Sequence, residues 1–183
     1  MPTIPAVATQ VIVLNGTSSS GKTGIARCLK AILPEPWISL GIDDLIAALP
    51  PSLRETGAGI AIGDRGDVTV GDGFREAEAA WLAGLAAMAH AGARVIVDDV
   101  FLGGAASQAR LRAHLAGLAV LWVGVRCDPA IAAGREVARG DRVIGLAAAQ
   151  APVVHEGVAY DLEVDTGHAE SLDCASAIAA HLG

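Results

Sequence analysis

The sequence predicts a single α/β domain in which helices cover both faces of a parallel β-sheet. Short apolar runs rich in β-branched residues alternate with segments whose apolar residues recur at helical spacing, an alternation typical of βαβ units. The length of 183 residues fits one domain. No repeat of fixed period, low-complexity tract or linker divides the chain, so we expect one domain over 1–183.

The first elements surround a glycine-rich break. Residues 1–9 predict a loose tail, and Val11–Leu14 predicts a strand buried on both faces. Gly16–Gly21 interrupts the apolar pattern, and helical periodicity follows over Lys22–Leu33 until Pro34 ends it. The first strand is therefore expected to lead through a glycine-rich turn directly into a helix.

A second strand and an insertion follow. The strand is predicted over Trp37–Ile42, and a helix starts near Asp43. Residues 51–73 are rich in Gly, Pro and Asp and predict a short hairpin with strands at Ile60–Ile62 and Asp67–Val70. We expect this insertion to lie where a substrate binds, on the side of an active site that holds the acceptor of a transferred group.

The second half repeats the alternation of helices and strands. The predicted elements are a helix over Phe74–Ala91, a strand over Arg94–Asp98, a helix over Ala105–Leu115, a strand over Val120–Arg126, helices within Pro129–Gln150 broken at Gly140–Arg142, a strand over Asp161–Asp165 and a helix over His168–His181.

Composition excludes several classes of protein. With 52% hydrophobic and 18% charged residues the chain is not disordered. Its longest uncharged stretches, Ala79–Ala93 and Ala113–Val125, are shorter than the roughly 18–20 apolar residues of a membrane span, so no membrane helix is expected. A net charge of −7 argues against nucleic acid as a partner.

Cysteine usage and the N-terminus indicate a cytoplasmic protein. Cys28, Cys127 and Cys174 have no spacing that holds zinc, and an odd number of cysteines fits free thiols in a reducing compartment. No Lys or Arg precedes Lys22, so no secretion signal is expected. The sequence leaves the oligomeric state open, a homo-oligomer included.

One motif carries phosphate chemistry. A strand, then G-x-x-x-x-G-K-[ST], then a helix is the pattern of a P-loop, whose backbone N–H groups and helix dipole bind phosphate oxygens. The predicted nucleotide-binding residues of the loop are Gly16, Thr17, Ser18, Ser19, Ser20, Gly21, Lys22 and Thr23. We expect Lys22 to reach the β- and γ-phosphates and the Thr23 hydroxyl to bind Mg²⁺. The absence of an Asn-Lys-x-Asp guanine motif favours ATP.

Carboxylates follow two of the predicted strands at the edge where open α/β sheets bind ligands. Asp98 and Asp99 end the third strand, and we expect Asp98 to serve Mg²⁺, while Asp99 is an alternative for that role or a cap of the turn after it. Asp43 and Asp44 follow the second strand. Asp43 is the candidate that orients and deprotonates an attacking hydroxyl, and the alternative is that either residue caps the next helix.

Arginines concentrate late in the chain. Arg126, Arg135, Arg139 and Arg142 lie in or beside a region, about 128–150, that predicts a lid closing over phosphates. The alternative is a set of structural ion pairs, and Arg126 fits that alternative best. Among the remaining side chains, Trp37, Trp81 and Trp122 are expected in the core, and Trp37 or Phe74 is also a candidate for an apolar acceptor pocket.

Taken together, these motifs and their flanking residues resemble the chloramphenicol phosphotransferase family. The resemblance extends from about Val11 to His181, is weakest over 51–73, and departs in a longer N-terminus and in Thr23 where the family has serine. It rests on the blocks LNGTSSSGKTGIARCL, LPEPW, GIDDLI, AGARVIVDDVFLGGAA, VLWVGVRCD, ARGDRV and VVHEGVAYDLEVDT.

The resemblance implies a P-loop kinase fold similar to shikimate and nucleotide kinases, with a five-stranded parallel sheet. It also implies ATP-dependent phosphorylation of the drug's primary 3-hydroxyl, which inactivates the antibiotic, with ATP and Mg²⁺ as cofactors. Asp43 matches the family's catalytic aspartate, and Arg139 and Arg142 match its lid arginines, Arg142 acting in catalysis. Two other readings stay open: a kinase of the same fold with another hydroxylated acceptor, and a nucleotide-binding switch without turnover.

Overall fold

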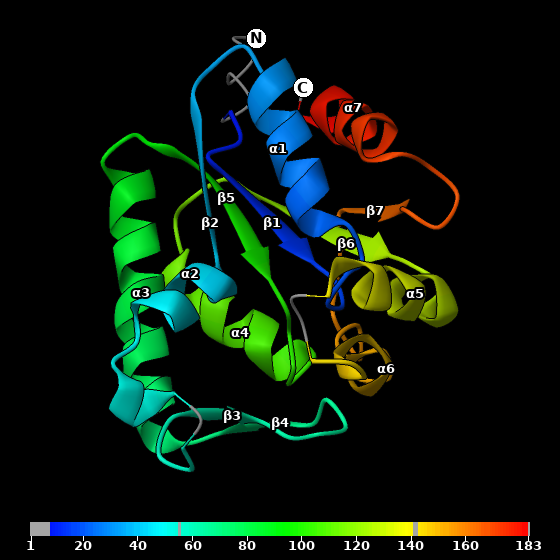
Figure 1. The fold of residues 1–183 in the computed structure, drawn as a ribbon. Helices are drawn as coiled ribbons and strands as arrows, with labels where there is room; N and C mark the ends of the chain where they lie inside the picture. Colours follow the sequence, from blue (N-terminus) through cyan, green and yellow to red (C-terminus); the bar gives the residue numbers. More distant parts are fainter. Residues whose placement is uncertain (1–7, 55, 141–142, 183) are drawn as a thin grey trace, which may run out of the picture.

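The computed structural model describes residues 8–54, 56–140 and 143–182. Within these ranges the predicted helices and strands are present, with ends that differ by a few residues (Figure 1). Most of the predicted N-terminal tail and the whole of Arg142 lie outside the described residues.

A parallel sheet forms the centre of the domain. In the described part of the chain it has five strands, which are β1 (Val11–Asn15), β2 (Trp37–Gly41), β5 (Arg94–Asp99), β6 (Val120–Arg126) and β7 (Leu162–Asp165). Their order is β2-β5-β1-β6-β7, and each neighbouring pair is parallel. This confirms the five-stranded parallel sheet.

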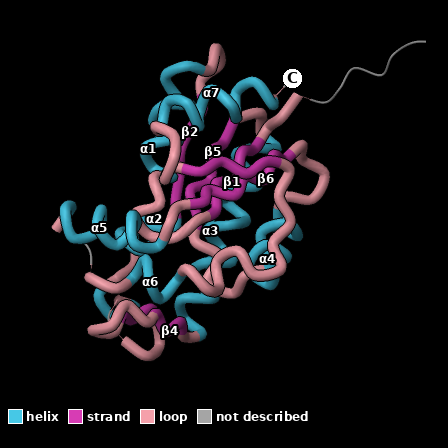
Figure 2. Tube along the Cα trace, turned by 90° about the vertical axis from the view of Figure 1, so that its right-hand side faces the viewer, coloured by secondary structure: helices cyan, strands magenta, loops and turns pink. Residues whose placement is uncertain are grey.

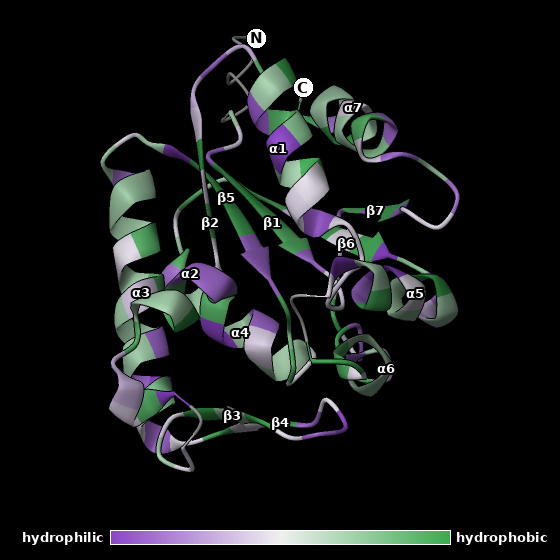
Figure 3. Cartoon of the chain, viewed as in Figure 1, coloured by the Kyte–Doolittle hydropathy of each residue, from purple (hydrophilic) through white to green (hydrophobic). Residues whose placement is uncertain are grey.

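Two helix layers cover the sheet (Figure 2). The layers consist of α1 (Lys22–Ile32) with α7 (Ser171–His181) on one face and α3 (Asp72–His90) with α4 (Ala105–His114) on the other. Successive residues of β1 point into opposite layers: Ile12 and Leu14 pack beneath α1 and α7, while Val11 and Val13 pack beneath α3 and α4. Burial on both faces explains the continuous hydrophobic colour of β1 in Figure 3.

Strand order places the loop after β1 at the switch point of the sheet. After β1, the chain first adds β2 and β5 on one side of β1 and then adds β6 and β7 on the other side. Ligands of open α/β sheets bind outside the carboxyl ends of the strands at such a point. The same edge receives Asp98 and Asp99 of β5, since Asn15 pairs with Asp99 and Gly41 of β2 pairs with Asp98.

The remaining elements gather around this edge. They are α2 (Ile42–Ala48), a 3-10 turn (Pro51–Leu53), β3 (Ile60–Ile62), β4 (Val68–Val70), α5 (Pro129–Arg139) and α6 (Leu146–Gln150). The predicted hairpin is confirmed, because β3 pairs antiparallel with β4. It extends below α4 toward α6 in Figure 1 and packs on α2 and the start of α3 through a small separate core.

Candidate functional site

A single large cleft of about 1010 Å³ lies along the carboxyl edge of the sheet in the described part of the chain. At one end, which we call the loop end, it is lined by the β1–α1 loop, the end of β5 and parts of α5 and α6. At the other, which we call the hairpin end, it is lined by α2, the β3–β4 hairpin and the start of α3. Asp43, Asp98 and Asp99 all line this cleft.

The β1–α1 loop has the backbone of an anion nest. Ser19 and Gly21 have φ angles of 57° and 95°, in the left-handed region that turns successive N–H groups to one side. Gly16 has a different requirement, because a Cβ there would lie 2.5 Å from the carbonyl oxygen of Val125. The loop then enters α1, whose N-terminal dipole favours a negative ligand at the same place.

Side chains of the loop fit an anion with many acceptor oxygens. The Lys22 ammonium, in a residue only 7% exposed, donates to the carbonyl oxygens of Gly16 at 2.9 Å and Thr17 at 2.6 Å. The hydroxyls of Ser18, Ser19 and Ser20 are buried with no hydrogen-bond partner among the described residues. Buried polar groups are normally hydrogen-bonded, so phosphate oxygens fit this loop well.

Thr23 and Asp98 lie together, as a shared metal role requires. The Thr23 hydroxyl donates to Oδ2 of Asp98 at 2.7 Å. Among the described residues no group of three or more His, Cys, Asp or Glu side chains is placed to hold a metal ion. A hydroxyl beside one carboxylate fits Mg²⁺, which typically takes one or two protein oxygens and completes its shell with phosphates and water.

Asp99 has a different environment from Asp98. Its Oδ1 accepts a hydrogen bond from the Val100 N–H at 2.7 Å, which confirms the alternative that Asp99 caps the following turn. Burial raises the pKa of Asp99 to about 6, and the negative charges of Glu78 and Asp98 act in the same direction. Burial thus makes the ionised form of Asp99 less favourable than that of a carboxylate in water.

The structure separates the tasks of Asp43 and Asp44. Asp44 accepts the Gly41 N–H at 2.7 Å and so caps α2 from its third position. Asp43 is exposed in the first turn of α2 and lines the cleft. The capping role that the sequence left open for both aspartates is thus occupied by Asp44, and the catalytic role stays a prediction for Asp43.

The arginines divide into two groups. Arg139, at the end of α5, lines the cleft, whereas Arg142 lies outside the described residues. Arg126 forms an ion pair with Glu163, which fits its structural alternative. Arg135 donates to the Thr166 hydroxyl at 3.1 Å and to the Thr166 carbonyl at 2.7 Å, so it ties α5 to the loop after β7.

Two residues that sequence reasoning missed brace the P-loop. Thr166 donates from its hydroxyl to the carbonyl oxygen of Ser20 at 2.6 Å. Gln150, at the end of α6 and only 6% exposed, accepts the Ser18 N–H on Oε1 at 2.6 Å. Neither residue has a motif around it, so no local signal identifies it.

Glu136 and Asn15 are further missed residues, and both organise segments around the loop end. Glu136, 1% exposed, accepts the Gly145 N–H at 2.7 Å and the Ala147 N–H at 3.1 Å, which fixes the start of α6. Asn15 donates to Tyr160 at 2.6 Å and accepts the Phe101 N–H at 2.9 Å. Asn15 thus connects the end of β1 to two distant segments, and Glu136 connects α5 to α6.

A half-buried histidine, His155, extends the Asn15 network. Nδ1 of His155 lies 2.6 Å from the Tyr160 hydroxyl, which already accepts from Asn15. The Tyr160 hydroxyl therefore has its proton available for His155. Burial lowers the pKa of His155 to about 4, and the nearby Arg126 guanidinium lowers it further. His155 is thus neutral near pH 7.

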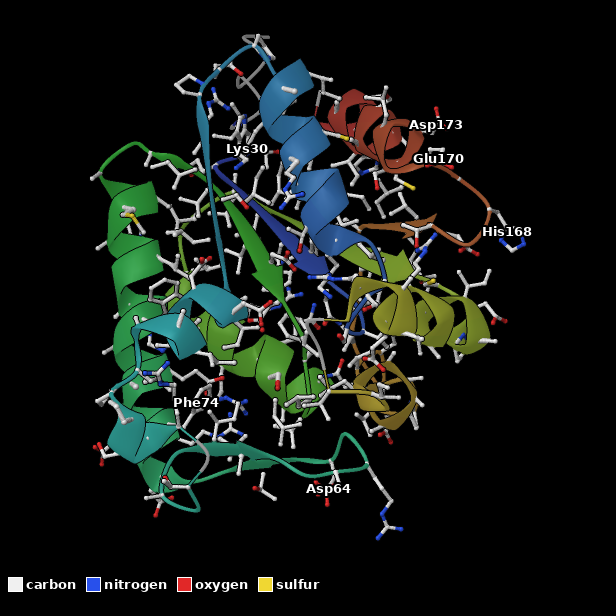
Figure 4. The ribbon with its side chains drawn as sticks, viewed as in Figure 1. Lys30, Asp64, Phe74, His168, Glu170 and Asp173 are labelled. Atoms are coloured by element: carbon white, nitrogen blue, oxygen red, sulfur yellow. The ribbon has the colours of Figure 1, made fainter. Side chains whose placement is uncertain are left out.

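The hairpin end of the cleft is apolar. Its wall includes side chains of α2, the hairpin and α3, namely Ile42, Ile46, Ile60, Ile62, Val68, Val70 and Phe74. Figure 4 shows Phe74 between α3 and the hairpin. Phe74 is thus the aromatic that lines the cleft, while Trp37 packs in the core beneath α1, as expected for it, with the Arg94 guanidinium over its ring.

Charges near this apolar wall are already paired. Arg75 donates to Glu78 at 2.8 Å, and Arg110 lies 3.7 Å from the same carboxylate. Arg54 and Arg65 do not line the cleft. The hairpin end is therefore better suited to a neutral molecule than to an anion.

The turn of the hairpin contacts the segment before α6 through backbone atoms. A Cβ on Gly66, in the turn of the hairpin, would lie 2.3 Å from the carbonyl carbon of Gly145, just before α6. Both glycines have positive φ angles, 78° for Gly66 and 103° for Gly145. No side chain fits between these two backbones.

Comparison with known proteins identifies the family. Residues 9–183 match the family described as chloramphenicol phosphotransferase-like protein. The chain belongs to this family. Proteins of Mycobacterium tuberculosis strains CDC 1551 / Oshkosh and ATCC 25618 / H37Rv, each named "Putative O-phosphotransferase", are 30% identical over 174 residues, which cover 86% of this chain and 75% of theirs.

Solved structures share the fold of this family member. A sugar kinase from Janibacter sp. HTCC2649 has a TM-score of 0.64 at 20% identity and covers 92% of this chain and 93% of its own. A shikimate kinase from Acinetobacter baumannii has a TM-score of 0.57 at 17% identity, covering 93% and 90%. Together the family match and the fold show that the protein is a P-loop kinase that acts on a small molecule.

Membrane insertion by a helix finds no support in the described ranges. None of the helices there combines the length and the apolar composition needed to cross a bilayer.

Proposed function

We propose that the protein transfers the γ-phosphoryl group of ATP to the primary 3-hydroxyl of chloramphenicol or a close relative and so inactivates the antibiotic. One observation supports the proposal: the P-loop, Asp43 and the apolar side chains of the hairpin end all line the same cleft. The family match supports the same acceptor class. Free cysteines at positions 28, 127 and 174 and the use of ATP favour a cytoplasmic site of action.

The reaction is an in-line displacement at phosphorus. The acceptor oxygen forms a bond to the γ-phosphorus, the bond from phosphorus to the β,γ-bridging oxygen breaks, and ADP leaves. Lys22 and the N–H groups of the loop neutralise charge that moves onto the bridging oxygen. Arg139 of α5 faces the same cleft and adds positive charge there, and Arg142 is proposed for the same task.

Asp43 orients the acceptor hydroxyl and takes its proton. An alcohol is a very weak acid, and in a loose transition state the nucleophile forms little bond before the leaving group departs. The proton is therefore transferred late, when the hydroxyl has become acidic. Asp44 already accepts the Gly41 N–H on Oδ2, and this hydrogen bond ties its side chain to the start of α2.

Mg²⁺ is the metal that this loop end fits. Thr23 and Asp98 would hold the ion, directly or through water, and the bound ion would neutralise charge on the β- and γ-phosphates. The 2.7 Å contact between the two side chains keeps both oxygens at the mouth of the nest.

Acceptor-dependent release of ADP tests the proposal. Chloramphenicol with Mg·ATP should yield ADP and a drug phosphorylated on its primary hydroxyl, which phosphorus NMR identifies. Lys22→Ala should raise the KM for ATP and lower turnover together, because the ammonium interacts with phosphates before and during the reaction. ATP hydrolysis that no acceptor stimulates would contradict a kinase role for chloramphenicol and favour a nucleotide switch.

A kinase for another neutral alcohol is the second candidate. The ion pair between Arg75 and Glu78 favours it over a kinase for acceptors that already carry phosphate, because no other arginine before β5 except Arg27 lines the cleft in the described residues. A panel of neutral drugs and metabolites distinguishes the two candidates, since the true acceptor should have the highest kcat/KM.

A further inference from the structure

Asp99 is a cleft carboxylate that the proposed reaction leaves without a task. Asp98 is engaged by the Thr23 hydroxyl, and Asp44 by the Gly41 N–H. Among the described residues, the only hydrogen-bond donor to Asp99 is the Val100 N–H, which reaches Oδ1. The other oxygen therefore keeps its acceptor capacity in a residue that lines the cleft.

Asp99 is the last residue of β5 and lines the loop end of the cleft. Gly41 of β2 pairs with Asp98 of β5, so Asp99 and Asp43 follow neighbouring strands at the same edge. Neighbouring strands lie about 4.8 Å apart, a span of the same order as that between the two oxygens of a 1,3-diol. The charges that act on Asp99 are the negative carboxylates of Glu78 and Asp98 and the positive ammonium of Lys22.

Glu78 is not equivalent to Asp99. Arg75 holds it at 2.8 Å and Arg110 approaches it at 3.7 Å. The hydrocarbon side chains of α2 and the hairpin in this wall offer no hydrogen bond to an acceptor. Asp99 is therefore the carboxylate best placed to distinguish acceptors by their hydrogen-bonding groups.

We propose that Asp99 accepts a hydrogen bond from a second hydroxyl of the acceptor and thereby selects 1,3-diols, one hydroxyl being phosphorylated beside Asp43 and the other held by Asp99. The inference rests on the proposed function and adds the substrate class. An ionised carboxylate only accepts hydrogen bonds, so an acceptor with a carbonyl or a methylene at the second position would leave it desolvated and unpaired. A site of this kind rejects such analogues strongly.

The test compares three acceptors at about pH 8, where carboxylates are ionised. They are chloramphenicol, its 1-oxo analogue and its 1-deoxy analogue, all of which retain the primary hydroxyl. The wild-type protein should phosphorylate chloramphenicol with a kcat/KM roughly 10- to 100-fold above that for either analogue, the range of one hydrogen bond to a charged group.

Asp99→Asn replaces a carboxylate oxygen that accepts a hydrogen bond with an NH₂ group that donates one. Its amide oxygen retains the Val100 N–H and its NH₂ group faces the cleft, so the 1-oxo analogue should become the preferred acceptor. The Asp99→Ala variant should have similar kcat/KM values for all three compounds. Asp161→Asn is the matched control, because Asp161 also accepts a backbone N–H, from Trp122 at 2.8 Å, but lies outside the cleft; it should keep the wild-type preference.

The outcomes separate the inference from the proposed function. A wild-type protein that phosphorylates all three compounds equally overturns the inference and leaves the proposed function intact. A preference for chloramphenicol that Asp99→Asn and Asp99→Ala both retain also overturns it. A wild-type protein that phosphorylates none of the three compounds overturns the proposed function and, with it, the diol preference. The comparison of acceptors needs no variant, so a misfolded variant does not prevent a decision.

Discussion

The loop end of the cleft is held by hydrogen bonds from distant segments, whereas the hairpin end is lined by apolar side chains of one local insertion. Gln150 and Thr166 each contact a backbone group of the P-loop across more than a hundred residues of sequence. At the hairpin end, Ile60, Val68 and Phe74 belong to a small core separate from the two cores beside the sheet. Directional contacts fix one geometry, while apolar contacts depend mainly on area and volume.

This difference indicates which end of the cleft tolerates amino-acid substitutions. A phosphate ligand is the same in every reaction of a kinase, so a rigid loop end suits it. An apolar wall built on a short hairpin accepts volume-conserving substitutions at little cost. Variants at the loop end should therefore affect catalysis and ATP, and variants at the hairpin end should affect the acceptor alone.

The largest expected effect lies at the junction of the two ends. Asp43→Asn should lower kcat by at least about 100-fold, with the KM for ATP nearly unchanged, because the lost group orients the hydroxyl and accepts its proton. Steady-state kinetics measures both constants. The matched control is Asp44→Asn, which weakens the cap of α2 and should lower the melting temperature more than kcat. Equal kcat losses in both variants would indicate that the first turn of α2 acts only as a structural unit.

The second-largest effect is expected from the hydrogen bond by which Gln150 braces the P-loop. Gln150→Leu leaves the Ser18 N–H without its partner and should raise the KM for ATP about 10-fold, with a smaller change in the KM for the acceptor. Gln108→Leu is the control, since Gln108 is equally buried at 5% and bonds the backbone of Ala159, away from the cleft. If both variants changed the KM for ATP alike, the brace would have no specific role.

A smaller effect is expected at the hairpin. Ile62, 42% exposed, lines the cleft, and Ile62→Thr removes apolar surface that an acceptor would cover. The KM for the acceptor should rise about 3- to 10-fold, while the KM for ATP stays constant. Ile38→Thr, at 44% exposure on β2 and outside the cleft, should change neither constant. A rise in the KM for ATP with Ile62→Thr would break the proposed division between the two ends.

The smallest effect concerns stability against pH. The folded chain holds the pKa of His155 at about 4, below its value of 6.5 in an unfolded chain, so the unfolded state binds more protons between these values. Stability should therefore fall as the pH falls from about 6.5 to 4, with no contribution from this group above that window. His155→Gln should flatten this part of a plot of melting temperature against pH. His168→Gln, at an exposed histidine, should leave the wild-type slope in place.

Local patterns explain why much of the site was predictable from the sequence. Residues 16–23 form one continuous segment whose spacing encodes the nest, and alternating apolar runs encode the strands on either side of it. The pairing of Thr23 with Asp98 also followed from the rule that parallel strands end at one edge.

The bracing hydrogen bonds of Gln150 and Thr166 could not be predicted from the sequence, because they join residues that are far apart in the chain. The hydrogen bond of Gln150 spans 132 residues, and that of Thr166 spans 146. Glutamine and threonine occur in every kind of segment, so neither type nor spacing identifies such a contact before the fold is known. Trp37 shows how the fold decides between two predictions for one residue: of the core and the pocket that the sequence allowed, the structure gives the core beneath α1.

The contact between Gly66 and Gly145 constrains how this scaffold can be redesigned. The turn of the hairpin rests on the main chain that precedes α6, and neither partner has room for a methyl group. A chimaera that imports a different hairpin must bring a turn of the same shape, or exchange the segment before α6 together with it. New acceptor ranges in this scaffold are thus acquired by grafting two pieces of chain at once.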